Sequence, residues 1–283
     1  MEGEADAVFN PPDYIEFYGR RNDGTSDTEL YKPASAQPHT YYNLFSDTTV
    51  YFLTYNNLAV LGKRIPKTWE VNVTSIPQET AHTDEKLLVN AQQHSDGIAY
   101  QQYIRKTSFD VGEGWTGVML SQNQTIDYAL EGLTNGVVAS GLPQLEVMVA
   151  GRAEITTAHR VEIYAGPNAS GLRLLGTQDV FNFNVHTFNL PLAWTDIGVD
   201  GRITVRMRLL AAGSAARASV SYIKINYPQN FEATGATEKY FQLAENPSGK
   251  SFISLTNVPA NSRLFDVTDP ANVIWYQPPA STF

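Results

Sequence analysis

The feature that most constrains this chain is a series of segments in which apolar and polar residues alternate. Such alternation sends successive side chains to opposite faces of a strand. Between the segments lie GPNASG, DIGVDG and AAGSAA, which are rich in turn-forming residues. Short strands separated by turns predict an antiparallel sandwich, and the lack of a convincing amphipathic helix between them disfavours a βαβ fold. The segments are LEVMVAG (145–151), HRVEIYAG (159–166), HTFNLPL (186–192), GRITVRMRLL (201–210) and ASVSYIKINY (218–227).

This pattern divides the chain into four regions. We predict an all-β chain in which residues 106–228 form an antiparallel, jelly-roll-like β-sandwich, with smaller β-rich segments at residues 1–68 and 229–283. Residues 69–105 connect the first segment to the sandwich and could add strands to it. Within them, residues 84–94 could form a short helix or an extended segment. The strand-like stretches outside the sandwich are 14–18, 50–55 (VYFLTY), 70–76 (EVNVTSI), 239–243, 250–255, 263–267 and the extended tail from 274.

The composition excludes several classes of function. Without cysteine, the 283-residue chain has no disulfide scaffold, thiolate nucleophile, zinc–thiolate site or iron–sulfur cluster. A net charge of −9 with no cluster of Lys and Arg argues against nucleic acid as a partner. No run approaches the ~20 apolar residues that span a bilayer, so we expect no membrane span. The opening MEGEADAVFNPP has no secretory-signal pattern and reads as the interior of a longer chain, so we expect a fragment.

Acidic side chains near the N-terminus are candidates for a calcium (Ca2+) site. Asp23, Asp27 and Glu29 offer oxygen ligands at a spacing that a hard cation could use. A looser set consists of Asp6, Asn10 and Asp13. Neither set has the full EF-hand pattern. The alternative is a polar hairpin loop, in which Asn, Asp and Gly accept left-handed conformations.

A second group of candidates could bind a saccharide. In FDVGEGWTG (109–117), Trp115 could be a platform for a sugar ring, with Asp110 and Glu113 hydrogen-bonding its hydroxyls. Trp194 is another candidate for an exposed aromatic. The alternative is a glycine-rich strand start in which the tryptophan is part of the core or the sheet edge.

Catalytic patterns are weak. The histidines show no H-E-x-x-H spacing, and the chain has no G-x-S-x-G elbow. Asp110 and Glu113 could be the carboxylates of a glycoside hydrolase, but only their separation could show that. Surface or hydrogen-bonded roles are therefore expected for His39, His82, His94, His159 and His186.

Five stretches occur in an order that resembles the region preceding the peptidase domain of gingipain-like cysteine peptidases (the C25 class). The type IX secretion sortase of Bacteroidetes belongs to that group. The resemblance covers almost the whole chain, and its motifs are mostly structural. The stretches are DYIEFYGRRNDG, NLFSDTTVYFLTY, SFDVGEGWTG, VSYIKINYPQNF and RLFDVTDPANV.

The resemblance implies a β-rich, non-catalytic region of a secreted or cell-surface bacterial protein associated with the outer membrane. In such proteins an α/β peptidase domain with a Cys–His dyad follows. Because this chain has no cysteine, none of the family's catalytic residues can be assigned to it. We expect an accessory scaffold that contacts the downstream peptidase domain and docks a protein substrate or secretion partners. The alternative function is a carbohydrate-binding module that uses exposed aromatics.

Overall fold

The predicted alternating segments all form strands, as the computed structural model of the chain shows. The structure describes residues 10–11, 14–54, 63–69, 75–153, 158–210, 215–247 and 249–277. Most of its regular structure is β, which confirms the predicted all-β class. The five strands are β7 (Gln144–Gly151), β8 (His159–Gly166), β10 (Val185–Pro191), β11 (Ile203–Leu210) and β12 (Arg217–Gln229).

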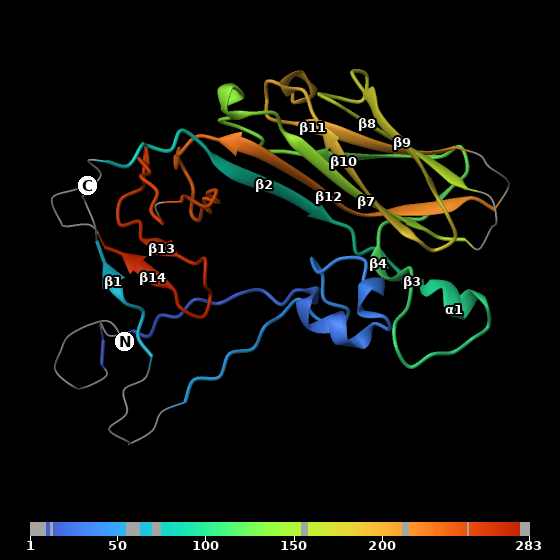
Figure 1. The fold of residues 1–283 in the computed structure, drawn as a ribbon, viewed down its shortest axis with the longest axis horizontal. Helices are drawn as coiled ribbons and strands as arrows, with labels where there is room; N and C mark the ends of the chain where they lie inside the picture. Colours follow the sequence, from blue (N-terminus) through green and yellow to red (C-terminus); the bar gives the residue numbers. More distant parts are fainter. Residues whose placement is uncertain are drawn as a thin grey trace.

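Two antiparallel sheets form a sandwich (Figure 1). One sheet has the order β10–β7–β12–β2, and a short fifth strand also pairs with β12. The other has the order β6–β11–β8–β9. The strands not yet given are β2 (His82–Val89), β5 (Leu120–Ser121), β6 (Thr125–Leu130) and β9 (Arg173–Val180).

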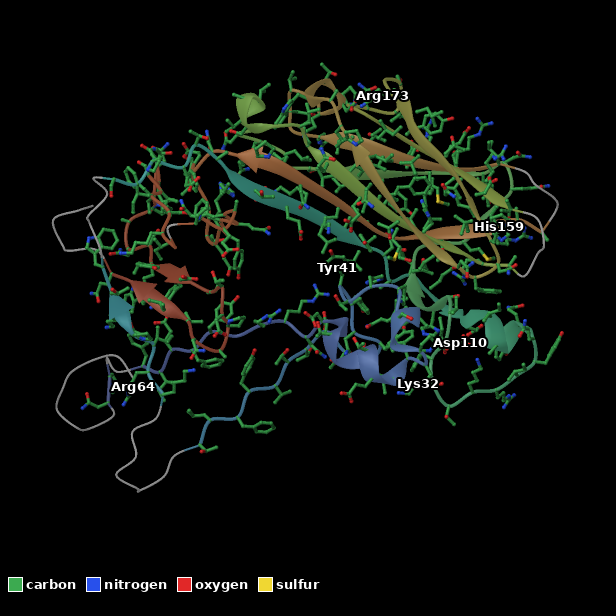
Figure 2. The ribbon with its side chains drawn as sticks, viewed as in Figure 1. Lys32, Tyr41, Arg64, Asp110, His159 and Arg173 are labelled. Carbon is green, nitrogen blue, oxygen red and sulfur yellow. The ribbon has the colours of Figure 1, made fainter. Side chains whose placement is uncertain are left out.

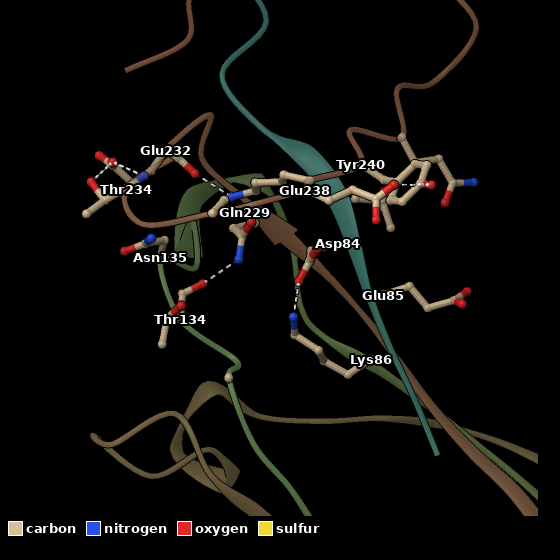
Figure 3. Close-up of a pocket in the computed structure, with 15 residues that line it drawn as sticks. Asp84, Glu85, Lys86, Thr134, Asn135, Gln229, Glu232, Thr234, Glu238 and Tyr240 are labelled. Carbon is tan, nitrogen blue, oxygen red and sulfur yellow. Dashed lines mark hydrogen bonds and ion pairs between the residues drawn. The ribbon is translucent and has the colours of Figure 1, made fainter. Parts of the chain in front are cut away.

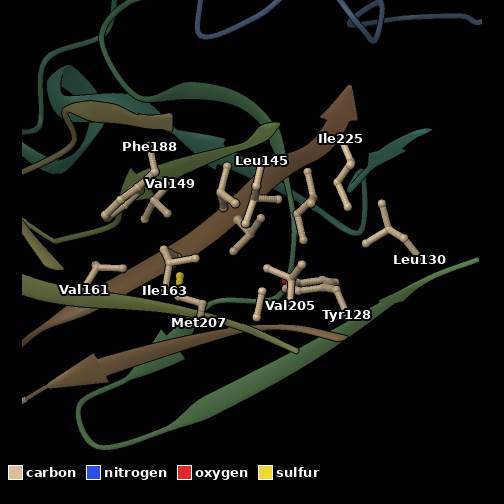
Figure 4. Close-up of a cluster of buried hydrophobic side chains, with 14 of the residues drawn as sticks. Tyr128, Leu130, Leu145, Val149, Val161, Ile163, Phe188, Val205, Met207 and Ile225 are labelled. Atoms are coloured by element: carbon tan, nitrogen blue, oxygen red, sulfur yellow. The ribbon is translucent and has the colours of Figure 1, made fainter. Parts of the chain in front are cut away.

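The core fills the space between the two sheets (Figure 4). Val147 lies at its centre, with Phe188 of β10 and Ile223 of β12 as its register partners. All three side chains are buried. Each such side chain contributes about 1.5–3 kcal/mol to folding when it leaves water, so the sandwich forms the stable body of the chain. From the opposite sheet come Tyr128, Leu130, Val161, Ile163, Val205 and Met207.

Two small sheets flank the sandwich. The strands β3 (Gln93–Asp96) and β4 (Glu113–Thr116) pair antiparallel, with the short helix α1 (Gly97–Gln101) between them in sequence. A three-stranded sheet joins two stretches that lie far apart in the sequence, because its strand at residues 67–68 pairs in parallel with its strand at residues 274–276. Its strands are β1 (Lys67–Thr68), β14 (Ile274–Tyr276) and β13 (Leu264–Asp266).

The N-terminal segment packs against the outer face of the five-stranded sheet. It contains two 3₁₀ helices, η1 (Gly24–Leu30) and η2 (Ala34–Ala36). After them, the rings of Tyr41 and His39 meet Tyr222 of β12 edge to face, with centroids 4.8 and 5.4 Å away. Lys224 donates to the Tyr41 hydroxyl at 2.9 Å. Figure 2 labels Tyr41 at this junction between segment and sandwich.

The strand predictions outside the sandwich had mixed outcomes. No strand forms over residues 15–18 or 50–54, so those predictions are wrong for the described residues. In KYFQL and KSFISL the structure has only isolated bridges, at Gln242 and Phe252. RLFDV contains β13, and the tail contains β14. Residue 55 of VYFLTY, most of EVNVTSI and the end of the tail lie outside the described residues.

The connecting segment, for which two readings were open, is extended over most of residues 84–94. Strand β2 covers its first part and pairs with β12 in the five-stranded sheet. The division of the chain into four regions stays a prediction. Among the described residues, no helix is long and apolar enough to cross a membrane.

Candidate functional site

Trp115 lies in β4 and is half-buried, and its indole N–H already has a hydrogen-bond partner. Its indole Nε1–H donates to the Leu44 carbonyl at 3.0 Å. His94 and Tyr42 approach the ring edge to face, with centroids 5.4 and 6.2 Å away. The tryptophan therefore ties the N-terminal segment to the β3–β4 pair, and its ring is not an open platform for a sugar.

Asp110 and Glu113 hold the turn before β4. The Asp110 backbone N–H donates to Glu113 Oε2 at 2.9 Å, and Asp110 Oδ2 accepts from the Ala99 backbone N–H at 3.2 Å. Lys106 forms an ion pair with Asp110 at 3.4 Å. Burial, together with the carboxylates of Asp110 and Asp96, raises the pKa of Glu113. Asp110, Glu113 and Trp115 thus share one structural unit, which the β3–α1–β4 chain segment forms.

Trp194 belongs to a different part of the sandwich. It begins the 3₁₀ helix η4 (Trp194–Asp196), and its Nε1–H donates to the Gly141 carbonyl at 3.0 Å. Its ring meets Tyr227 edge to face and lies directly over Gly136, where a Cβ would come within 2.2 Å of the ring. Trp194 therefore packs against the core, and the structure does not bring it together with Trp115.

The predicted calcium ligands lie on or beside η1, and the two aspartates have protein partners. Asp23 caps η1 by accepting from the Thr25 N–H at 2.9 Å. Asp27 is buried and accepts from Asn43 Nδ2 and from the Leu44 N–H, both at 2.7 Å. Glu29 is exposed. In the part of the chain that the structure describes, no group of three or more His, Asp or Glu could hold a metal ion. Asp6 and Asp13 lie outside that part.

A polar pocket that no sequence motif predicts lies at one end of the five-stranded sheet (Figure 3). Its volume is about 590 Å³. Strand β2 forms one wall, and the end of β12 with the segment after it forms another. Most of its side chains can donate or accept hydrogen bonds. The lining includes Asp84, Glu85, Lys86, Thr134, Gln229, Glu232, Glu238, Lys239 and Tyr240.

The base of this pocket is a fixed hydrogen-bond network. Gln229 Nε2 donates to the Tyr227 hydroxyl at 2.7 Å and to the Thr134 carbonyl at 2.9 Å. Asp84 and Lys86, two residues apart on β2, form an ion pair at 3.0 Å. Burial, followed by the Asp84 carboxylate, raises the pKa of Tyr227. The Gln229 amide N–H groups and the Asp84 carboxylate therefore already have protein partners at the base.

The rim of the pocket comes from the segment after β12. Glu232 accepts from Asn257 Nδ2 at 2.9 Å and from the Thr234 backbone N–H at 3.0 Å. Hydrogen bonds from Thr234 and Asn257 lower the pKa of Glu232 to about 2. Tyr240 is 56% exposed, and its hydroxyl donates to Glu238 Oε1 at 2.8 Å. The rim thus carries one oriented aromatic ring among hydrogen-bonding groups.

A separate surface feature is an apolar ribbon, defined here as Phe17 and Val50–Leu53. The rings of Phe17 and Tyr51 are in contact, with centroids 5.2 Å apart. The Tyr51 hydroxyl accepts from the Arg20 N–H and donates to the Arg20 carbonyl, which holds the two stretches together. Phe52 is 87% exposed and Leu53 77% exposed. Adjacent apolar side chains exposed to this degree are typical of an interaction surface.

Comparison with known proteins gives a match in fold. No protein-family model and no curated protein sequence matches the chain. The chain is similar to dimeric latent PorU from Porphyromonas gingivalis, with a TM-score of 0.51 and 11% identity. That match covers 76% of this chain and 19% of PorU, so the chain spans about a fifth of that protein.

Two other solved structures show much weaker similarity. The K3 cleaved adhesin domain of Lys-gingipain from Porphyromonas gingivalis w83 has a TM-score of 0.30 and 11% identity, and the match covers 50% of this chain and 90% of that domain. Carbohydrate-binding module CBM36, in complex with calcium and xylotriose, has a TM-score of 0.28 and 16% identity, with 50% and 98% covered. At these identities the likeness to PorU concerns the fold alone.

Proposed function

We propose that this chain is a non-catalytic accessory region of a secreted or cell-surface, gingipain-like peptidase, and that it serves as a scaffold that docks the peptidase domain. The apolar ribbon is the observation that carries the proposal. The likeness in fold to PorU supports the proposal. That match covers 76% of the chain, which is more than residues 106–228, the predicted sandwich.

The ribbon has the sequence of a buried strand. A continuous apolar run such as VYFL is typical of a strand covered on both faces. In the described part of the chain, residues 50–53 lie in no strand and are exposed. An exposed segment that belongs to no sheet can accept a strand of another domain. A docked domain would then cover the apolar side chains on both sides.

The energetics favour such a contact. Burial of one large apolar side chain contributes about 1.5–3 kcal/mol, and Val50, Phe52 and Leu53 are all available for it. A domain in the same chain avoids most of the entropy cost of association, because its effective concentration is high. The same ribbon is available to a protein substrate or a secretion partner, which is the wider form of the docking role.

The test is to produce this chain and the peptidase region encoded after it as two polypeptides, and to measure their association by calorimetry. We expect binding by the unmodified chain and loss of binding by the double variant Phe52→Asp/Leu53→Asp. The matched control is Val138→Asp/Val199→Asp, which adds the same charges at two other exposed apolar positions.

Three results would contradict the proposal. The gene could encode no peptidase region after these residues, the ribbon variant could bind as well as the control, or the purified chain could itself hydrolyse a peptide substrate. Thermal melts of both variants exclude loss of folding as the cause of lost binding.

A further inference from the structure

The polar pocket lies apart from the apolar ribbon in sequence and shares no residue with it. Its lining comes from three distant stretches, which are β2, the loop after β6, and the end of β12 with the segment that follows (Figure 3). The rim is fixed to β2, because the Thr83 backbone N–H donates to the Gln242 carbonyl at 2.9 Å. A volume of about 590 Å³ is in the range of sites for small molecules.

The charges in the pocket are largely compensated by protein partners. Asp84 pairs with Lys86, and Glu232 accepts from Thr234 and Asn257. Lys239 donates to the Glu232 carbonyl and lies over the Phe241 ring. The lining nevertheless has four carboxylates (Asp84, Glu85, Glu232 and Glu238) against two lysines (Lys86 and Lys239), a net charge of −2. This balance disfavours an anion such as a phosphate or a uronic acid.

Tyr240 supplies the one apolar ring of the described lining. Its hydroxyl donates to Glu238, and this hydrogen bond places the ring at the rim. The aromatic face can pack against the C–H groups of a sugar ring, as an amphipathic side chain with a polar tip does. Each sugar hydroxyl both donates and accepts, which matches a lining in which Lys donates, Asp accepts, and Thr and Gln do both.

We propose that this pocket binds a neutral oligosaccharide, with Tyr240 stacked on one sugar ring and with Asp84 and Lys86 hydrogen-bonded to hydroxyl groups. This goes beyond the docking function proposed above. It also moves saccharide recognition away from the half-buried Trp115 and Trp194. A polar peptide is the competing occupant, and the test separates the two.

The experiment titrates the whole chain with cellotetraose, mannotetraose and tetragalacturonate, and with a neutral Gly-Ser peptide, followed by amide chemical shifts. We expect one neutral saccharide to shift amides of β2 and of residues 229–242, and no shift with the galacturonate. Tyr240→Ala should weaken binding about tenfold or more, through loss of the aromatic contact.

The matched control is Tyr100→Ala, because Tyr100 is also 56% exposed but lies on α1. This control should bind as the unmodified chain does. The ribbon variant Phe52→Asp/Leu53→Asp should also keep full saccharide binding, so the two proposals fail independently. No shift with either neutral saccharide at millimolar concentration would overturn the inference. So would equal loss in both tyrosine variants, or shifts with the peptide alone.

Discussion

The guanidinium of Arg173 and the carboxylate of Asp196 form a two-point ion pair between the start of β9 and helix η4. Arg173 Nε donates to Oδ1 at 2.7 Å and Nη2 donates to Oδ2 at 2.6 Å. Asp196 is only 4% exposed, and its Oδ2 also accepts from the Ala193 N–H at 2.7 Å. This pair joins the edge of the four-stranded sheet to the loop that carries Trp194.

Removal of the Arg173 charge should destabilise the sandwich. Arg173→Met keeps the apolar stem but leaves a buried carboxylate with one backbone donor, which we expect to lower the free energy of unfolding by about 2 kcal/mol. Urea denaturation followed by circular dichroism measures the change. Arg160→Met is the control, because Arg160 pairs with Asp179 in the same two-point geometry at a more exposed site. A loss as large in the control would show that burial of Asp196 is irrelevant.

Trp194 should act in stability and not in binding. Trp194→Ala removes a ring that covers Gly136 and meets Tyr227, so we expect a loss of about 2–3 kcal/mol in unfolding free energy. Trp194→Phe keeps a ring and loses the hydrogen bond to Gly141, at a cost of about 1 kcal/mol. Both variants should bind saccharide as the unmodified chain does. A selective loss of saccharide binding in Trp194→Ala, with unchanged stability, would restore the exposed-platform interpretation.

The sandwich strands could be predicted because their signals are local. In β8 and β11 the buried positions alternate, and in β7 and β12 they alternate over part of the strand. Turn residues mark the ends, so the predicted and observed bounds of these strands differ by at most two residues. The sequence does not predict strand β9, since most of its residues are exposed or half-exposed and do not alternate clearly between apolar and polar. The sequence of β2 does not distinguish a strand from a helix, because it carries polar residues such as Asp84 and Lys86 and shows no clear alternation. In the structure these two side chains line the pocket.

The pocket could not be predicted from the sequence. Asp84, Thr134 and Glu232 meet only after the sheet has formed, and no short motif joins them. At Val50–Leu53 a sequence signal is present but the structure does not follow it. The residue types favour a strand, and within the described residues this segment pairs with no strand. Trp115 was a reasonable candidate for an exposed aromatic, but its environment depends on Leu44, more than seventy residues away. These contacts are set by tertiary structure and leave no periodic signal.

Calcium should leave the thermal stability of the chain unchanged. Both carboxylate oxygens of Asp27 already accept protein hydrogen bonds, and Asp23 is engaged as the cap of η1. We therefore expect the same melting temperature in excess calcium and in EDTA. A ligand that binds only the folded state at a hundred times its dissociation constant would add about 2.7 kcal/mol, which a melt resolves. If calcium raised the melting temperature and Asp23→Asn abolished that increase, the calcium site expected from the sequence would be established.

Acidification below neutral pH should destabilise the chain through its histidines. Burial is the largest cause that lowers the pKa of each of the five, and it lowers the pKa of His39 to about 4. His39 also accepts the Tyr41 N–H at Nδ1, 3.2 Å away, and protonation would remove that acceptor. Because the unfolded chain has the ordinary pKa near 6.5, it takes up more protons than the folded chain between that pH and 4. The free energy of unfolding therefore falls as the pH falls through this window.

For His39 alone we expect a loss of about 1–2 kcal/mol between about pH 7.5 and pH 5, before most carboxylates titrate. Urea denaturation at several pH values in this range measures it. His39→Asn keeps an acceptor for the Tyr41 N–H and cannot take the proton, so its stability should depend less on pH by that amount. His186→Asn is the control. Because the His186 ring is less buried than that of His39, this variant should change the pH dependence of the unfolding free energy less. Two results would show that His39 is not held neutral by the contact between the N-terminal segment and β12. The unfolding free energy could rise on acidification, or it could change with pH as steeply in His39→Asn as in the unmodified chain.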